Sequence, residues 1–243
     1  MCRQFKEQNL DPGGFAEYIR VPGPNVRHAT FRIPYELDKL VSDEAVSFTE
    51  PLACCLRAVK RSQLVAGDTV LVVGLGSIGL MFVQLFRRIG CVVLAVDPIR
   101  SRQKLAWRYG GFTEEKPDIP EMVHDFTDGR GVDCLVVTAG GAEVLQWGEP
   151  LVRDGGQIHC FAGGEDPYIP IPFDRFYHRE LTLTTTYSSS PAELGEAFDL
   201  LCHGRIKVRR LITHRLPLAS LNEAVALMRS REALKVFVTS EAT

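Results

Sequence analysis

Hydrophobic runs and amphipathic helical patterns alternate along the middle of the chain. The runs are rich in β-branched residues and read TVLVV (69–73), CVVLAVD (91–97), VDCLVVT (132–138), GGQIHCFAGG (155–164) and ELTLTTTY (180–187). Helical patterns follow the first two, at SIGLMFVQLFRR (77–88) and IRSRQKLAWRY (99–109). Strands that are apolar on both faces and alternate with helices are typical of a parallel sheet covered on both sides. The pattern predicts an α/β fold with a doubly wound parallel sheet.

The two ends of the chain follow a different pattern. GFAEYIRV (14–21) alternates apolar and polar residues, which predicts a half-buried strand, and the PGP that follows at 22–24 predicts a turn. LKVFV (234–238) predicts a closing strand. We therefore expect residues 1–50 and 204–243 to form, or partly form, a second unit that flanks a core at 51–203.

FTEPLACCLRAV (48–59) predicts a helix that opens near Pro51, because proline is favoured in the first turn. Four apolar residues recur at helical spacing on one face, namely Leu52, Cys55, Leu56 and Val59. Cys55 is then a small core residue and Cys54 its neighbour at the edge of the apolar stripe. Packing does not account for Glu50, so Glu50 stays a candidate for chemistry.

The turn after the first run, VLVVGLGSIGL, places Gly74, Gly76 and Gly79 in the G-x-G-x-x-G spacing. Such glycines make a tight turn, let the backbone approach a pyrophosphate, and let helix and strand pack closely. Ser77 and Ile78 open the following helix, whose N-terminus would face the phosphates. The spacing alone is a weak signal, but here a strand precedes it and a helix follows. We therefore predict dinucleotide binding.

Asp97 ends the second run, roughly 20 residues after the glycine loop, where an acid accepts hydrogen bonds from the adenosine ribose. Its charge would repel a 2'-phosphate, so the sequence favours NAD over NADP. Arg100 and Arg102 complicate this prediction, because an arginine here can pair with that phosphate. Arg102 could equally lie over the adenine face, and both arginines also fit exposed helix charge.

Loops that follow the later strands are candidates for the nicotinamide half of the site, because ligands bind at the carboxyl ends of parallel strands. Some of these residues fit plain turns equally well. The candidates are Thr138, Ala139, Phe161, Ala162, Gly163, Thr186 and Tyr187. His159, in a predicted buried strand, lacks a partner at metal-ligand spacing and is interpreted as structural.

Composition narrows the class of protein. The chain has 243 residues, is 45% hydrophobic and 24% charged, and carries a formal charge of -2. Near-neutral charge gives no reason to expect nucleic acid as a partner. No apolar run reaches the roughly 18 residues of a membrane span, and MCRQFKEQNL is not a signal peptide, so we expect no membrane association and a cytoplasmic location. Seven cysteines without framework spacing then indicate thiols.

The ordered blocks GGFAEYIRVP, EPLACCLRAV, GDTVLVVGLGSIGL, AVDPIRSRQKLA, DGRGVD, ITHRLPL and KVFV resemble the zinc-containing medium-chain dehydrogenases, in particular the sorbitol and threonine dehydrogenase branch. The resemblance covers essentially the whole chain. It implies a Rossmann domain joined to a GroES-like catalytic domain built from both chain ends. Where the family has a fuller third strand, GGFTEEKPDIPEM (110–122) is short and polar, so we expect that strand to be weak.

The resemblance implies oxidation of a secondary alcohol or polyol to a ketone, with hydride transfer to NAD. An open-site zinc assists this chemistry as a Lewis acid. Glu50 matches the glutamate of the family's E-P-L motif at or near the catalytic zinc, and Cys2 matches the last of four cysteines around a structural zinc. The family also implies a homo-oligomer, a dimer or tetramer through the sheet edge. Sorbitol-like polyols, threonine and cyclitols all remain open as substrates.

The family's catalytic cysteine, its G-H-E motif and three structural cysteines have no counterpart after Met1. We therefore expect the chain to lack the N-terminal part of the catalytic domain, with Glu50 and Cys2 as orphan ligands of incomplete zinc sites. Zinc-assisted activity would then be impaired. The alternative is a non-catalytic NAD(H)-binding module or pseudoenzyme, and a zinc-free reductase is a third hypothesis.

Overall fold

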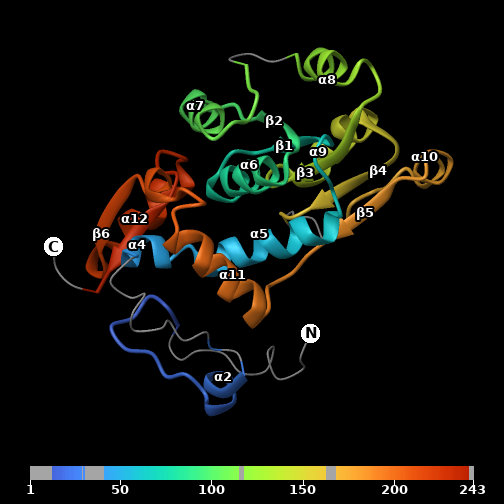
Figure 1. Ribbon diagram of the computed structural model, residues 1–243. Coiled ribbons are helices and arrows are strands. Elements are labelled where there is room, and N and C mark those ends of the chain that lie inside the picture. The colour runs from blue at the N-terminus through green and yellow to red at the C-terminus, as the bar shows by residue number, and fades with distance from the viewer. Residues whose placement is uncertain (1–12, 29, 31–40, 115–117, 163–167, 241–243) are drawn as a thin grey trace. The chain divides into compact units, whose positions relative to one another are not determined.

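The computed structural model describes residues 13–28, 30, 41–114, 118–162 and 168–240. The chain divides into two compact units. Figure 1 labels the helices and strands of both. The sheet unit comprises Pro51–Ser189, and the terminal unit comprises Met1–Glu50 with Ser190–Thr243. Residues 190–203, which the sequence groups with the core, fall in the terminal unit.

The sheet unit alternates strands and helices as the sequence predicts. Its elements are α5 (Thr49–Ser62, counted here although its first two residues belong to the terminal unit), β1 (Thr69–Val73), α6 (Ser77–Ile89), β2 (Val92–Val96), α7 (Arg100–Arg108), α8 (Ile119–Thr127), β3 (Val132–Val137), α9 (Gly141–Gly148), η1 (Glu149–Leu151), β4 (Val152–Cys160), α10 (Phe173–His178) and β5 (Thr182–Thr185). In α5 the predicted stripe is buried, Cys55 included, while Cys54 is only partly buried.

The five strands form one parallel sheet in the order β2-β1-β3-β4-β5. The chain leaves β1 toward β2 and then crosses back to β3 on the other side of β1. In open α/β sheets, ligands bind outside the carboxyl ends of the strands where the order reverses in this way. The fold is the predicted Rossmann-type α/β fold, and its reversal point lies between β1 and β3.

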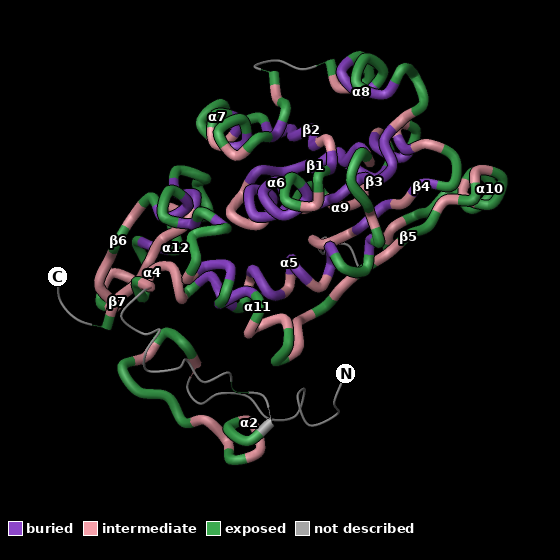
Figure 2. Tube along the Cα trace, viewed as in Figure 1, coloured by how far each residue is buried: buried purple, intermediate pink, exposed green. Residues whose placement is uncertain are grey.

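Helices cover both faces of the sheet. Alternate strand residues form one core with α8 and α9, and this core contains Leu71, Val73, Leu94, Val96, Met122, Val123, Val132, Leu135, Val137, Val144, Leu145, Val152 and Ile158. On the other face, Gln157 donates a hydrogen bond to the carbonyl oxygen of Ser62 in α5. Figure 2 shows that β1 and β3 are buried along their whole length. Burial on both faces explains the continuous hydrophobic runs.

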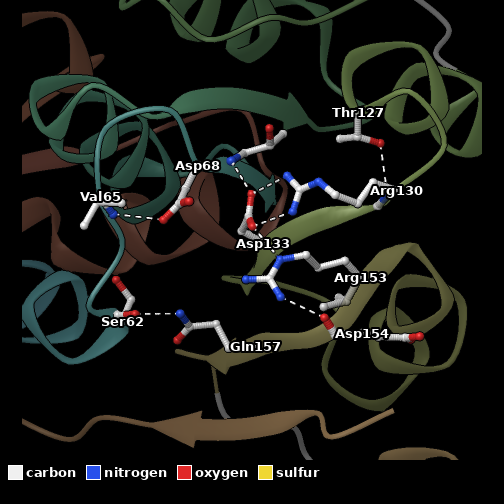
Figure 3. A network of polar contacts seen from close by, with 12 residues as sticks. Ser62, Val65, Asp68, Thr127, Arg130, Asp133, Arg153, Asp154 and Gln157 are labelled. Carbon is white, nitrogen blue, oxygen red and sulfur yellow. Dashed lines mark hydrogen bonds and ion pairs between the residues drawn. The ribbon is translucent and has the colours of Figure 1, made fainter.

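A charged network ties the amino ends of β1 and β3 together (Figure 3). The buried carboxylate of Asp133 accepts hydrogen bonds from Arg130 at 2.8 and 2.9 Å, from Arg153 at 2.6 Å and from the backbone N–H of Thr69 at 2.8 Å. Burial alone would raise the pKa of Asp133, but the hydrogen bonds from Arg130 and Arg153 outweigh burial and hold it well below its usual value. The network fixes β3 against β1 at the end of the sheet opposite the candidate site.

Both edges of the sheet differ from an ideal doubly wound fold. Beyond β2, the expected third strand is reduced to a single parallel bridge between Leu94 and Phe112, in line with its polar sequence. At the opposite edge, β5 has the predicted position, but it is not a buried strand: Thr182, Leu183 and Thr185 are exposed. Threonine suits an exposed strand as well as a buried one, because its β-branching favours extended backbone in both settings.

The terminal unit has little sheet. Its elements are α2 (Gly23–His28), α4 (Asp43–Val46), α11 (Pro191–Cys202), η2 (Arg209–Leu211), β6 (His214–Pro217), η3 (Leu218–Ser220), α12 (Leu221–Arg229) and β7 (Val236–Thr239). β6 and β7 pair in parallel, and α12 packs on β7. Within this unit Arg215 binds both carboxylate oxygens of Glu44. β7 confirms the predicted closing strand.

The predicted strand at 14–21 is wrong. Residues 14–18 form bends, Arg20 makes an isolated bridge, and Phe15 and Tyr18 are 68% and 86% exposed. The predicted turn at 22–24 is wrong as well, because Gly23 and Pro24 open α2. An alternating segment forms a strand only where a neighbouring strand can pair with it and a core can pack against its apolar face. No named strand of the described residues pairs with this segment. None of the described helices has the length and apolar character that a bilayer crossing requires.

Candidate nucleotide-binding site

The glycine loop begins with Gly74, directly after β1. Its φ of 90° lies in the left-handed region, which strongly favours glycine. A Cβ on Gly74 would also lie 2.8 Å from Oγ1 of Thr138 and 2.8 Å from the Cβ of Ala139, both in the loop after β3. The backbone N–H of Gly74 donates to the carbonyl oxygen of Val96 at 2.9 Å. Gly74 is therefore required both by its conformation and by the close approach of the β3 loop.

Gly76 and Gly79 have opposite surroundings. A Cβ on Gly79 would lie 1.9 Å from the carbonyl oxygen of Gly74, so the first turn of α6 packs directly on the loop. A Cβ on Gly76 would meet no atom of the described residues within 4 Å, although Gly76 has an ordinary φ of -64°. In the described part of the chain, open space therefore lies over Gly76, at the N-terminus of a 13-residue helix without a side-chain cap. Ser77 and Ile78, which open this helix, are partly exposed.

This arrangement fits a pyrophosphate. Unpaired backbone N–H groups and the dipole at a helix N-terminus attract anions, and a missing side chain lets phosphate approach the backbone. At Gly76 the missing side chain would let a phosphate approach the backbone, and Gly79 lets α6 pack closely on the loop after β1. The described residues of the loop thus have the cradle that a dinucleotide needs.

Thr138 connects β3 to the glycine loop across the reversal point. Its hydroxyl lies 2.7 Å from the carbonyl oxygen of Gly74 and 3.0 Å from that of Val73, and its backbone N–H donates to Val73 at 3.0 Å. The side chain points into the loop rather than toward solvent, so Thr138 stabilises the conformation of the glycine loop. The following residue, Ala139, is exposed.

Asp97 lies directly after β2 and is engaged by the backbone on both carboxylate oxygens. Oδ2 accepts from the N–H of Leu75 at 2.7 Å, and Oδ1 accepts from the N–H of Ile99 at 2.8 Å. A guanidinium nitrogen of Arg102 lies 3.6 Å from Oδ2, and Gln103 donates to the carbonyl oxygen of Asp97 at 2.7 Å. The structure therefore brings Asp97, Arg102 and the glycine loop together.

The loops after β4 and β5 border the same edge of the sheet. Phe161 and Ala162 both donate their N–H groups to the carbonyl oxygen of Val137. The ring of Phe161 packs edge-on against Phe82 of α6, with centroids 5.0 Å apart. Tyr187 is 69% exposed, and Gly163 lies outside the described residues. Each of these described candidates thus follows the carboxyl end of a strand.

His159, which the sequence analysis interprets as structural, is buried and contacts the segment after β5. It is 1% exposed in β4, and its Nε2 lies 3.1 Å from Oγ1 of Thr186, after β5. Nδ1 is buried without a hydrogen-bond partner in the described part of the chain. Burial, with a smaller effect of Arg61, lowers the pKa of His159 to about 4. The neutral ring therefore donates from Nε2–H to Thr186, since a buried lone pair costs less than a buried unpaired N–H.

The described residues do not fit a zinc ion. Among them, no group of three or more His, Cys, Asp or Glu side chains is placed to hold a metal. Glu50 is exposed in the first turn of α5, whereas Cys55 is buried in the same helix. Cys2 lies outside the described residues. No step of the chemistry below is therefore assigned to zinc.

Comparison with known proteins gives a consistent family. The family model described as zinc-binding dehydrogenase matches residues 77–202, just over half of the chain. The sorbitol dehydrogenase of Halalkalibacterium halodurans is 29% identical over 237 residues, which cover 95% of this chain and 66% of that protein.

Two solved structures share the fold. The alcohol dehydrogenase from Thermus sp. ATN1 is 28% identical with a TM-score of 0.84, covering 94% of this chain and 66% of that one. A protein from Sinorhizobium meliloti 1021 described as a zinc-binding dehydrogenase, bound to NADP, is 29% identical with a TM-score of 0.79, covering 93% and 66%. The chain thus spans just under two thirds of the length of each of these relatives.

Proposed function

The chain belongs to the zinc-binding dehydrogenase family, and on that premise we propose that it binds NAD(H) in the sheet unit for the oxidation of a secondary alcohol or polyol. The observation that carries the proposal is the open space over Gly76 at the N-terminus of α6. Close packing elsewhere in the loop, at Gly74 and Gly79, gives that opening a fixed shape.

The acid after β2 supports NAD as the preferred cofactor. In dinucleotide-binding folds an acid after the second strand faces the adenosine ribose and disfavours a 2'-phosphate, and Asp97, beside the glycine loop, would have that role. The relative from Sinorhizobium meliloti binds NADP, so the family premise supports a nicotinamide dinucleotide without selecting its form.

The proposed reaction removes a hydride from the carbinol carbon and releases the hydroxyl proton to solvent, which leaves a ketone. Bound NAD would supply the hydride acceptor. The chain's own residues would position the nicotinamide: Phe161 is held by its ring contact with Phe82, and Thr186 is held by His159. Productive hydride transfer needs the reacting atoms aligned in close contact, so rigid walls of this kind favour it.

A second candidate function is a dinucleotide-binding module without dehydrogenase activity. The observation that favours it is the lack of a metal-ligand group among the described residues. Dinucleotide binding is common to both functions, and alcohol oxidation separates them.

Titration calorimetry with NADH, paired with an activity assay, tests both functions. Wild type should bind NADH, and Gly76→Ala should bind it at least about tenfold more weakly because the new methyl fills the phosphate approach. The variant should unfold within about 1 kcal/mol of wild type, since the loss at this helix cap is small. Absence of NADH binding to folded wild type would exclude both functions. If the protein binds NADH but, with zinc added, oxidises no sorbitol-like polyol, threonine or cyclitol, the result would support the non-catalytic binding module.

We also propose that the partner of the chain is a second copy, paired through β5. β5 is an edge strand, and Leu183 on it is 37% exposed. A cavity of about 620 Å³ adjoins this edge and is lined in part by Leu145, Ile171, Phe176 and Leu183. An unpaired strand edge next to apolar surface favours pairing with an identical strand.

A further inference from the structure

The carboxylate of Asp97 is enclosed. Its side chain is 4% exposed, and each oxygen already accepts a backbone N–H, from Leu75 at 2.7 Å and from Ile99 at 2.8 Å. These two hydrogen bonds join the glycine loop to the start of α7. Asp97 therefore stabilises the glycine loop through hydrogen bonds, and its carboxylate presents little surface to a ribose.

Arg102 is the more accessible member of the pair. Its side chain is 18% exposed, and NH1 lies 3.6 Å from Oδ2 of Asp97. Within the described residues, this ion pair is the only polar contact of the Arg102 guanidinium. A guanidinium carries five N–H donors in a planar fork, which suits the oxygens of a phosphate. Most donors of Arg102 therefore remain for an anionic ligand.

The charge around this pair is not strongly negative. Arg102 offsets the charge of Asp97, and α7 begins with Arg100 and has no acidic residue in its first turn. A 2'-phosphate at this position would meet a shielded carboxylate and an accessible guanidinium. The repulsion expected from an acid after β2 is correspondingly reduced.

We propose that Arg102 makes the site tolerant of a 2'-phosphate, so that NADPH binds within about tenfold of NADH. The inference rests on the proposed dinucleotide site and adds which forms of the dinucleotide it accepts. Asp97 keeps the loop in shape, and Arg102 sets the selectivity.

The test compares dissociation constants for NADH and NADPH by titration calorimetry on wild type, Arg102→Ala and Arg102→Lys. Arg102→Ala should weaken NADPH at least about tenfold and NADH less than about threefold, and Arg102→Lys should fall between wild type and Arg102→Ala for NADPH. Arg108→Ala, which removes an exposed arginine from the same helix, is the matched control and should leave both constants unchanged. NADPH binding should also weaken more steeply with added salt than NADH binding.

Two results would overturn the selectivity role while leaving dinucleotide binding intact. One is NADPH binding more than about tenfold weaker than NADH in wild type. The other is an equal loss for both dinucleotides in Arg102→Ala, which indicates an arginine stacked on adenine. Failure of folded wild type to bind either dinucleotide would instead overturn the proposed function itself, and this inference with it.

Discussion

Gly79, in the first turn of α6, lies so close to Gly74 that a Cβ on Gly79 would come within 1.9 Å of the Gly74 carbonyl oxygen. The same carbonyl faces the hydroxyl of Thr138 at 2.7 Å, so it cannot move away without disturbing β3. We expect Gly79→Ala to cost about 3 kcal/mol or more of unfolding free energy, because the clash is with backbone. Urea denaturation measures it, and Gly76→Ala is the control with open space. Equal stability of the two variants would contradict this packing.

Asp133 should contribute strongly to the stability of the sheet unit. Asp133→Asn removes the negative charge between Arg130 and Arg153. We expect the free energy of unfolding to fall by about 2–4 kcal/mol, because removing one partner of a buried ion pair is strongly destabilising. Partial exposure of the two arginines reduces this cost. Asp154→Asn is the control, since Asp154 is 80% exposed and its ion pair with Arg179 should contribute less than about 1 kcal/mol.

The pH dependence of this contribution follows from the lowered pKa of Asp133. The carboxylate is charged in the folded state where the unfolded chain has begun to bind a proton, so the contribution is full above about pH 4 and lost as pH falls below it. The free energy of unfolding of wild type should therefore fall more steeply with decreasing pH below about pH 4. Asp133→Asn should lack the part of this fall that comes from protonation of Asp133. A variant with the same acid dependence as wild type would rule out the role.

His159 should destabilise the fold in mild acid. Its folded pKa of about 4 lies below the unfolded value of about 6.5, so the unfolded state binds more protons between these values. Stability is full above about pH 6.5 and should fall by about 3 kcal/mol as pH drops to 4.

Urea midpoints across this window measure the effect of His159. His159→Gln can still hydrogen-bond to Thr186 but does not titrate, so its stability should be flatter with pH. His124→Gln is the control, because the His124 side chain is 72% exposed on α8. Parallel curves for wild type and His159→Gln would contradict the assignment of a buried neutral imidazole.

The sheet unit was readable from sequence because its central strands, β1 and β3, are buried on both faces. Runs such as 69–73 and 132–138 are hydrophobic at nearly every position, and only a central parallel strand makes that composition favourable. The segment 14–21 shows the limit of such patterns. Its alternation is a property of the segment, whereas a strand needs a partner and a core that lie elsewhere in the chain.

The candidate site was partly readable for a related reason. The glycine spacing reports a local backbone geometry, and the structure has the predicted turn at Gly74 and the predicted close packing at Gly79. The enclosure of Asp97 by two backbone N–H groups and Arg102 depends on how α7 turns back over the loop. The contact between His159 and Thr186 depends on the register of β4 and β5, which no local pattern contains. Dinucleotide binding by these residues stays a prediction.

The exposed edge at β5 should control assembly. We expect wild type to sediment as a dimer or tetramer and Leu183→Lys to shift toward monomer, because a lysine on an edge strand disfavours pairing with another strand and places charge against the adjoining apolar cavity. Val65→Lys is the control, since Val65 is 61% exposed in the same unit but lies outside the strands. Sedimentation velocity over a range of protein concentrations measures the shift. Both variants place a lysine at an exposed apolar position, but only Leu183→Lys changes the edge strand. A monomeric wild type, or an equal shift for both variants, would therefore exclude β5 as the interface.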